Sequence, residues 1–355
     1  MTRRLLILNA GSVTGNNLIR SLQSGEPSLH MVGCATDRFT LKRSIADRNY
    51  LVPEPEAAWA NSLRALIERE RIDLVIPNND DDVAAIGRLR ETLNCRVFLP
   101  RTEVIERCWD KFALATFFAS RGISVPATYA VESVEQLEEL FNGFPAGSRL
   151  WCRIRKGSGS IGAMPVTNAR QARWWIEYWE EMRDVAPGMF TLAEYLPGRD
   201  ITVQCVFRSG TLYIAKMLER LAYNVIGGGP SGISSTASLG KMFHEPHIVD
   251  LCLRAVAALD PRADGAFSLD LRENAGGEPC ITEINAGRFA NGPIVHDMAG
   301  EPSTILTYVR LALEENVDVV AGAPYADDCY IQRHLDMPPA VLKASELSVG
   351  IENPS

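Results

Sequence analysis

Short apolar runs alternate with helical patterns through the first hundred residues. The runs lie at residues 4–8, 31–35, 74–77 and 97–99, and the helical patterns at 17–22 and 59–68. This alternation predicts a parallel sheet with helices on both faces. Ligands of such sheets bind at the carboxyl ends of the strands. Two polar segments, 9–12 and 78–82, follow the first and third runs, so we expect them at that edge.

A smaller unit with a different pattern begins near residue 108. A helical stretch at 110–118 ends before Gly122, and a glycine after a helix is typical of a C-cap. A strand pattern at 149–155 then runs into a glycine-rich segment and a tryptophan-rich helix at 169–182. We expect the tryptophans to pack against a small sheet. We therefore expect a second unit after the parallel-sheet domain.

Two strand patterns in the last third of the chain form a predicted hairpin around a Gly-Gly turn. Because side chains alternate along a strand, Glu283 and Asn285 point to one side, and Thr282 and Ile284 point to the other. Asp270, on the neighbouring strand, can face the side of Glu283. Two carboxylates and an amide carbonyl are hard oxygen ligands that suit Mg²⁺. The alternative is a polar sheet face turned to water.

Composition limits the classes of function. The chain has 355 residues, of which 46% are hydrophobic and 23% charged, as in soluble globular proteins. Its net charge of -8 argues against nucleic acid or an anionic membrane as a partner. No apolar run reaches the ~20 residues that a membrane span needs. The 8 cysteines occur singly, without a Cys-x-x-Cys pair, which favours a reduced, cytoplasmic setting.

The turn after the first strand is similar to a dinucleotide-binding turn. Gly11 and Gly15 precede and enter a helix, and Asp37 follows the second strand. The spacing is G-x-x-x-G, however, and the full G-x-G-x-x-G pattern is absent. The alternative to an NAD site is a doubly wound domain that uses glycine only to make a tight turn.

Two further segments have features of nucleotide sites. Residues 157–162, which we call the flap, form a glycine-rich hairpin whose backbone N–H groups can bind phosphate. Arg153, Arg155 and Lys156 place positive charge beside it. In the stretch 192–203 a strand runs into a Pro-Gly turn, where a strand edge can face adenine and the acid beyond it can bind ribose. Taken alone, each is also typical of an ordinary hairpin or turn.

The order of these motifs resembles the ATP-grasp superfamily, in particular the carbamoyl-phosphate synthase large subunit and carboxylate–amine ligases. The resemblance covers roughly residues 1–315 and rests on an Asp-Lys helix, the basic strand with its flap, Glu-Tyr-Leu-Pro-Gly-Arg-Asp, and Asp270 before Glu283-Ile-Asn285. It implies an α/β fold in which a doubly wound parallel-sheet domain precedes a two-lobed α+β ATP-grasp fold. The implied parts are a first domain 1–107, a small lobe 108–192, a large lobe 193–325 and a loosely attached tail 326–355.

The resemblance also implies roles for individual residues. Lys111 would contact phosphate, and Arg153 stands where the family usually has a second lysine. The phosphates would further be covered by Lys156, Gly157, Ser158, Gly159, Ser160 and Gly162. The adenine hinge would consist of Glu194, Tyr195 and Leu196, with Asp200 at the ribose. Asp270 and Glu283 would bind Mg²⁺ on ATP together with Asn285.

Two arginines would act on the substrate side. Arg220 would clamp a carboxylate or phosphate, and Arg288 would stabilise an acyl phosphate. The family usually reads Glu-x-Asn-x-Arg, whereas Ala286 and Gly287 separate Asn285 from Arg288 here. The added residue leaves open the direction in which Arg288 points.

The implied function is an ATP-dependent carboxylate–amine ligase. Its cofactors would be ATP and Mg²⁺, with Mn²⁺ as an alternative, and its partners a small carboxylate, an amine and a second copy of the chain. The acidic segment 78–82 would suit the amine. An NAD-dependent oxidoreductase is one alternative. A catalytically inactive nucleotide-binding relative is another, favoured by Arg153 and by the residue added before Arg288.

Overall fold

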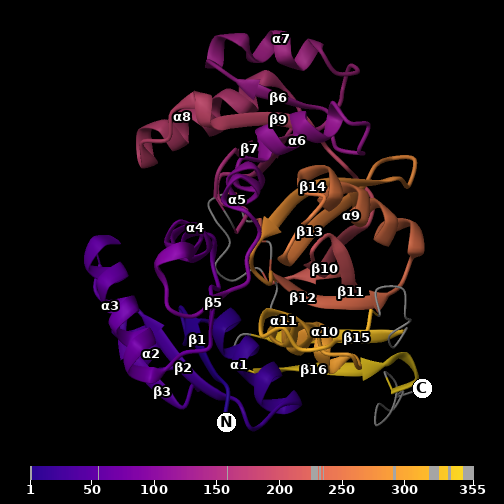
Figure 1. Cartoon of the computed structure of the whole chain (residues 1–355). Helices are drawn as coiled ribbons and strands as arrows, with labels where there is room; N and C mark the ends of the chain where they lie inside the picture. The colour runs from indigo at the N-terminus through magenta and orange to yellow at the C-terminus, as the bar shows by residue number, and fades with distance from the viewer. Residues whose placement is uncertain are drawn as a thin grey trace, which may run out of the picture.

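We describe the fold from a computed structural model of the chain, in which the described residues form three β-sheets with their helices (Figure 1). The structure describes residues 2–54, 56–157, 159–224, 231, 233–234, 236–290, 293–319, 328–334 and 337–346. A five-stranded parallel sheet comes first, followed by a four-stranded and a seven-stranded antiparallel sheet. This order confirms the predicted fold class, a parallel-sheet domain followed by two α+β lobes.

The first sheet has the strand order β3-β2-β1-β4-β5. Its strands are β1 (Arg4–Leu8), β2 (His30–Ala35), β3 (Arg48–Leu51), β4 (Leu74–Ile76) and β5 (Arg96–Val97). Its helices are α1 (Val13–Gly25), α2 (Arg38–Leu41), α3 (Glu56–Glu70) and α4 (Asp80–Leu89). β3 has no counterpart among the predicted runs, because it is an edge strand whose side chains are mostly exposed.

The two polar segments meet at the carboxyl ends of β1 and β4, where the strand order reverses. The Asn78 amide donates to the hydroxyls of Ser12 and Thr14 at 3.2 Å each. Residues 78–82 are not a loop throughout, because Asn79 caps α4 and the three following aspartates form its first turn. Acidic side chains are favourable there because they complement the helix dipole.

The second sheet forms the small lobe at the top of Figure 1. Its order is β6-β9-β7-β8, with β6 (Thr128–Val131), β7 (Leu150–Ile154), β8 (Met164–Val166) and β9 (Phe190–Glu194). It is accompanied by α7 (Leu137–Asn142) and α8 (Ala169–Arg183). Trp175 and Trp179 of α8 are buried with residues of this sheet, as predicted, whereas Trp174 is exposed. β7 and β8 form the predicted hairpin that carries the flap.

The third sheet has the order β14-β13-β10-β11-β12-β15-β16. Its first five strands are β10 (Asp200–Arg208), β11 (Thr211–Tyr223), β12 (Ala237–Phe243), β13 (Gly265–Glu273) and β14 (Pro279–Ala286). The accompanying helices are α9 (Pro246–Leu259), α10 (Pro293–Met298) and α11 (Thr304–Ala312). Leu251 of α9 is buried with Val203 and Leu269, whereas α11 is buried with Val206 and Ala266. Because neighbouring residues of a strand face opposite sides, α9 and α11 cover opposite faces.

The prediction that residues 326–355 form a loosely attached tail is wrong for part of that segment. β15 (Cys329–His334) pairs with β12, and β16 (Met337–Lys343) pairs with β15, so both extend the large sheet. Ile331 is buried with Leu218 and Met242. The sequence pattern does not predict β16, because Pro338 and Pro339 are unfavourable inside a sheet. An edge strand such as β16 tolerates them.

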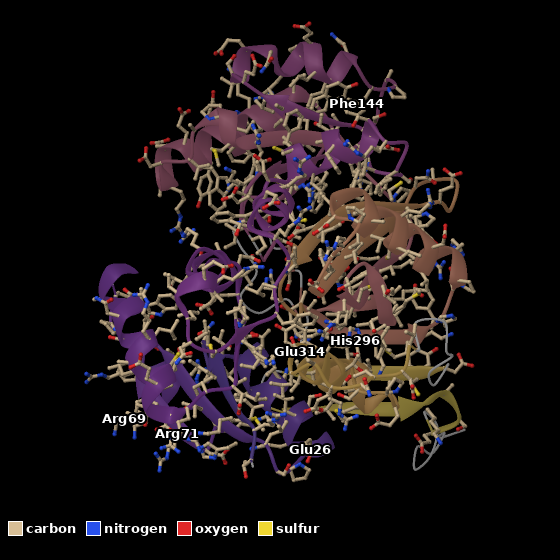
Figure 2. All side chains as sticks on the ribbon, in the orientation of Figure 1. Glu26, Arg69, Arg71, Phe144, His296 and Glu314 are labelled. Carbon is tan, nitrogen blue, oxygen red and sulfur yellow. The ribbon has the colours of Figure 1, made fainter. Side chains whose placement is uncertain are left out.

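Residues far apart in the chain hold the first domain against the large lobe. Ile305 and Val309 of α11 are buried in the same cluster as Leu18 of α1. After α11, Glu314, which is labelled in Figure 2, accepts a hydrogen bond from Arg96 of β5 at 2.8 Å. The helices α5 (Thr102–Trp109) and α6 (Lys111–Ala119) lead from this domain into the small lobe. The first domain is therefore part of the framework of the site described next.

Candidate active site

The β13–β14 hairpin brings the three predicted metal residues to one face. Asp270 lies directly opposite Glu283, and Ser268 lies directly opposite Asn285. Directly opposed residues of an antiparallel pair project on the same side of the sheet. The prediction that Asp270, Glu283 and Asn285 share a face is therefore confirmed by the register.

A β-bulge changes the alternation beside Glu283. The register shifts after Asp270, so that Ile281 lies opposite Leu271. Ile281 and Ile284 are both buried in the core, and the Thr282 hydroxyl donates to the Asp270 carbonyl at 3.0 Å. The prediction that Thr282 shares the face of Ile284 is wrong, because the bulge adds a residue between two core positions. Bulges often redirect side chains next to active sites.

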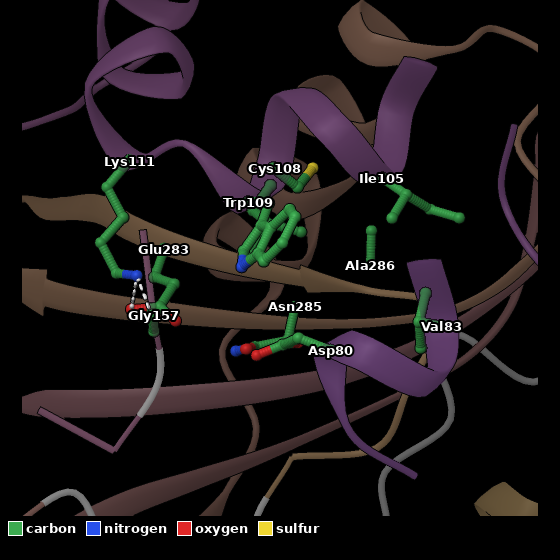
Figure 3. A pocket seen from close by; sticks show the side chains of 11 residues that line it. Asp80, Val83, Ile105, Cys108, Trp109, Lys111, Gly157, Glu283, Asn285 and Ala286 are labelled. Atoms are coloured by element: carbon green, nitrogen blue, oxygen red, sulfur yellow. Dashed lines mark hydrogen bonds and ion pairs between the residues drawn. The ribbon is translucent and has the colours of Figure 1, made fainter. Parts of the chain in front are cut away.

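The N-terminus of α6 places Lys111 beside Glu283. Asp110 caps this helix and is held by the Arg155 guanidinium at 2.8 Å. The Lys111 ammonium lies 2.5 Å from the Gly157 carbonyl and 3.7 Å from the Glu283 carboxylate (Figure 3). Burial lowers the pKa of Lys111, and the charge of Glu283 opposes this effect. Lys111 thus connects the flap to a predicted metal residue.

Arg153 extends from β7 to the same hairpin. Its guanidinium donates to the Thr282 carbonyl at 2.9 Å, and among the described residues its buried Nε has no hydrogen-bond partner. Burial lowers the pKa of Arg153, against the charges of Glu283 and Asp270. A buried donor without a partner is unusual and indicates a place where a water or ligand atom binds.

The flap has a left-handed backbone along most of its described length. The φ angle is positive at Gly157, Gly159, Ser160 and Gly162. Glycine adopts this conformation without steric cost, so the sequence suits a loop with exposed N–H groups. Lys156 is exposed beside the flap, and Ser158 lies outside the described residues.

Arg220 binds two residues that were predicted to bind ligands, Asp200 for ribose and Asp270 for the metal. Its guanidinium donates to Asp200 at 3.0 Å and to Asp270 at 2.5 Å, and its side chain is only 7% exposed. Burial lowers the pKa of Arg220, but the charges of Asp270 and Asp200 outweigh it and raise the pKa overall. Tyr223 also hydrogen-bonds to Asp200. The residues predicted for ribose, metal and substrate thus bind one another in this structure.

Gly287 turns Arg288 toward the predicted metal residues. Its φ of +91° is accessible to glycine, and a Cβ there would lie 2.8 Å from Val83. Arg288 donates to the Asn285 side-chain oxygen at 2.5 Å and to Asp80 at 3.0 Å, with its Nε on the second oxygen of Asp80. Burial lowers the pKa of Arg288, but Asp80 outweighs it and raises the pKa. The residue added to the family pattern therefore does not turn Arg288 away from the site.

The predicted adenine hinge joins the two lobes. Glu194 ends β9 of the small sheet, and Asp200 begins β10 of the large sheet. Between them the Tyr195 ring lies 6.3 Å from the Trp151 ring and 5.0 Å from the Arg149 guanidinium. Leu196 is buried and Glu194 is exposed.

The glycine turn after β1 is filled by the chain itself. A Cβ on Gly11 would lie 1.9 Å from the carbonyl oxygen of Thr40. Asp37, the acidic residue of the dinucleotide-like pattern, caps α2 by accepting from the Thr40 N–H at 2.6 Å. The geometry favours the alternative in which these glycines serve a tight turn.

Several of these residues border a pocket at the edge of β14 (Figure 3). Its polar side consists of Asp80, Lys111, Glu283 and Asn285. Its apolar side consists of Val83, Ile105, Cys108, Trp109, Ile284 and Ala286. The volume of about 20 Å³ has room for water and not for a nucleotide. Trp109 had no assigned role, whereas Asp80 belongs to the acidic segment 78–82 that we expected to suit the amine.

Asp82, in the same helix turn as Asp80, makes stability depend on pH. Its Oδ2 atom is buried and has no hydrogen-bond partner within the part of the chain that the structure describes. Burial raises the pKa of Asp82 from 3.8 to about 7, and the charge of Asp81 acts in the same direction. The folded state therefore keeps a proton that the unfolded chain loses, so the free energy of unfolding should fall as pH rises from about 4 to about 7. In Asp82→Asn this fall should be smaller when urea unfolding is measured at pH 5 and pH 8.

The exposed neighbour Asp81 supplies the control for this prediction. Asp81→Asn should retain most of the decrease in unfolding free energy, because its own carboxylate stays hydrated. Equal pH dependence in Asp82→Asn and the parent chain would contradict the prediction.

No protein-family model matches the sequence. The chain superimposes on the L-amino acid ligase from Bacillus licheniformis with a TM-score of 0.71, covering 93% of this chain and 78% of that chain at 12% identity. For N5-carboxyaminoimidazole synthetase from Staphylococcus aureus the TM-score is 0.68, with 93% and 82% covered at 13% identity. The chain has the ATP-grasp fold. Biotin carboxylase from Campylobacter jejuni is a further ATP-grasp structure that it resembles, with a TM-score of 0.72, coverage of 93% and 74%, and 15% identity.

Within this ATP-grasp fold the predicted metal residues suit Mg²⁺ by their chemistry. The described residues contain no cluster of three His, Cys, Asp or Glu side chains with metal-site geometry. The predicted set instead combines the carboxylates of Asp270 and Glu283, opposed across two strands, with the Asn285 amide. Hard oxygen ligands that leave positions for phosphate oxygens are what Mg²⁺ requires. Among the described helices, none is long and apolar enough to cross a membrane.

Proposed function

We propose that this chain is an ATP-dependent ligase that joins a carboxylate to an amine or a related nucleophile. The observation that supports it most is the opposed pair of Asp270 and Glu283 in an ATP-grasp fold, with the Lys111 ammonium 3.7 Å from Glu283. Such a set of carboxylates and a buried cation suits the phosphates of a metal-bound nucleotide. The γ-phosphoryl group would pass to the carboxylate, and the nucleophile would displace phosphate from the acyl phosphate.

Asp270, Glu283 and Asn285 would hold Mg²⁺, or Mn²⁺, which would neutralise charge on the phosphates. In this structure Asp270 is bound by Arg220 at 2.5 Å. Nucleotide binding would therefore require Arg220 to exchange partners. A substrate carboxylate is a suitable new partner, because guanidinium binds carboxylates through two parallel hydrogen bonds.

The remaining residues would position the phosphates and neutralise their charge. Lys111 and Arg153 bring two buried positive charges to the face of Glu283. The flap would cover the phosphates with backbone N–H groups, and Arg288 would face the group being transferred. Phosphoryl transfer depends on positioning and charge stabilisation, so the mechanism requires no protein nucleophile.

Two similar structures that were solved with bound nucleotide support the choice of nucleotide and metal. The biotin carboxylase from Campylobacter jejuni was solved as a complex with β,γ-ATP. The biotin carboxylase domain of 2-oxoglutarate carboxylase from Hydrogenobacter thermophilus was solved as a dimer with MgADP and bicarbonate. For this chain we propose ATP with Mg²⁺, a homodimer and a cytoplasmic location.

A catalytically inactive nucleotide-binding relative is the second candidate. It is favoured by the ion pairs of Arg220 with Asp270 and of Arg288 with Asp80, which fill positions that a substrate would need. The oxidoreductase alternative has less support, because α2 packs against the Gly11 turn.

Measuring ADP release against a panel of amino acids and small carboxylates tests the proposal. We expect release that requires both Mg²⁺ and a carboxylate, and formation of a hydroxamate when hydroxylamine replaces the amine. ATP binding without turnover would favour the inactive relative. Binding of NADH without binding of ATP would favour the oxidoreductase.

A further inference from the structure

Trp109 differs from the other apolar residues that line the pocket in Figure 3. Val83, Ile105 and Cys108 belong to the core and are 1%, 6% and 3% exposed, whereas Trp109 is 37% exposed. Leaving that much of an indole in water forgoes the stabilisation that burial would give. The exposed part of Trp109 borders the polar side chains of the pocket, so it is available to a ligand that binds there.

The chain holds the Trp109 backbone firmly next to the reacting groups. Trp109 is the last residue of α5, and Lys111 is the first residue of α6. Asp110 between them caps α6 and is bound by Arg155 at 2.8 Å. In Figure 3 the Lys111–Glu283 pair lies to the left of the indole and the side chains of Asp80 and Asn285 lie below it, and all of these residues line the same pocket. A group bound against Trp109 would therefore adjoin both the metal residues and Asp80.

The chemistry of the residues that line the pocket suits a carboxylate substrate better than a nucleotide. One side carries carboxylates, an amide and an ammonium, and the other side carries hydrocarbon and an indole. The adenine of the nucleotide is assigned to the hinge, and the triphosphate that would reach this pocket has no apolar part to place against the indole. A carboxylate with a hydrocarbon side chain has both a polar reacting end and an apolar end, as the two sides require.

We propose that Trp109 contacts the apolar side chain of the carboxylate substrate and selects substrates by the size of that side chain. This inference rests on the proposed ligase function and assigns its substrate class, carboxylates with an aliphatic or aromatic group. The present volume of about 20 Å³ is smaller than such a group. The indole, which is not enclosed by the core, moves outward as the side chain enters.

Trp109→Ala in the full-length chain tests the selection. ADP release is measured with carboxylates of graded side-chain size at saturating MgATP. For the carboxylate that the parent chain prefers, kcat/KM should fall by about 10-fold or more, as expected when an apolar pocket contact is lost. Bulkier carboxylates should lose less or gain, and the KM for ATP should stay within about twofold. Trp174→Ala is the matched control, because Trp174 is an exposed tryptophan on α8 in the small lobe.

A binding measurement keeps this test independent of turnover. Tryptophan fluorescence of the parent chain, with an ATP analogue that cannot be hydrolysed, should change when an aliphatic carboxylate is added. The change should be lost in Trp109→Phe and kept in Trp174→Phe. A fluorescence change on adding the carboxylate, in a chain that releases no ADP with ATP, would contradict the proposed ligase function. It would still support a carboxylate-binding site at Trp109.

Two results would overturn the inference. One is a Trp109→Ala chain that unfolds at the parent temperature, raises the KM for ATP and leaves the ranking of carboxylates unchanged, which would assign the pocket to the nucleotide. The other is a fluorescence response that persists in Trp109→Phe.

Discussion

Glu283→Gln is expected to abolish ATP consumption while the fold stays intact. The Glu283 carboxylate lies opposite Asp270 and 3.7 Å from the Lys111 ammonium. Glutamine keeps the size of the side chain but removes one of two negative charges available to a metal and the partner of a buried lysine. Losing one preorganised electrostatic group lowers kcat by about 10²–10³-fold, and we expect at least this loss in ADP release at saturating Mg²⁺.

Glu278→Gln is the control in the same hairpin. Glu278 is exposed in the turn between β13 and β14, where its side chain contacts Asn274. ADP release should stay within about twofold of the parent chain, since exposed polar contacts of this kind contribute little to stability. Thermal unfolding of both variants checks the fold. A Glu283→Gln chain with parental ADP release and the parental Mg²⁺ requirement would remove the metal assignment.

The local sequence pattern was sufficient to predict the strands that consist of a continuous, buried apolar run. β1 and β2 are enclosed on both sides, so their sequences are nearly all hydrophobic. The β13–β14 hairpin was predictable for a second reason, because a Gly-Gly turn fixes which strands pair and thereby which side chains share a face. The shared face of Asp270 and Glu283 follows from that pairing.

Edge strands and bulges were not predictable in the same way. β3 and β16 lie at sheet edges, where one side of the strand has no neighbour and the apolar pattern is weak. The bulge beside Glu283 depends on how Ile281 and Ile284 both reach the core. Nothing in the spacing of these residues distinguishes that arrangement from strict alternation.

The partners of the charged site residues depend on tertiary structure. Motif order placed Asp200, Asp270 and Arg220 in one site, yet their direct contact follows from three strands that are adjacent in the large sheet. Asp80 reaches Arg288 across 208 positions of sequence, because the first domain packs against the large lobe. Such long-range pairs leave no local pattern in a single sequence.

Arg288→Gln is expected to lower kcat about 100-fold or more while ATP binding changes little. Arg288 contacts Asn285 at 2.5 Å and both oxygens of Asp80, and it faces the predicted metal residues rather than the hinge. A positive group that stabilises charge developing in the transition state affects kcat more than ground-state binding. Single-turnover ADP formation and ATP titration separate the two quantities.

Asp80→Asn is the matched variant for this prediction. It keeps the arginine and its contact with Asn285 but removes the ion pair that orients the guanidinium from the first domain. We expect a smaller loss of kcat, about tenfold, as for a lost hydrogen bond to a charged group. Equal losses in the two variants would mean that Arg288 acts only when Asp80 holds it. Parental kcat in Arg288→Gln would show that the pair is a structural link between the first domain and β14, and would move the catalytic charge to Lys111 and Arg220.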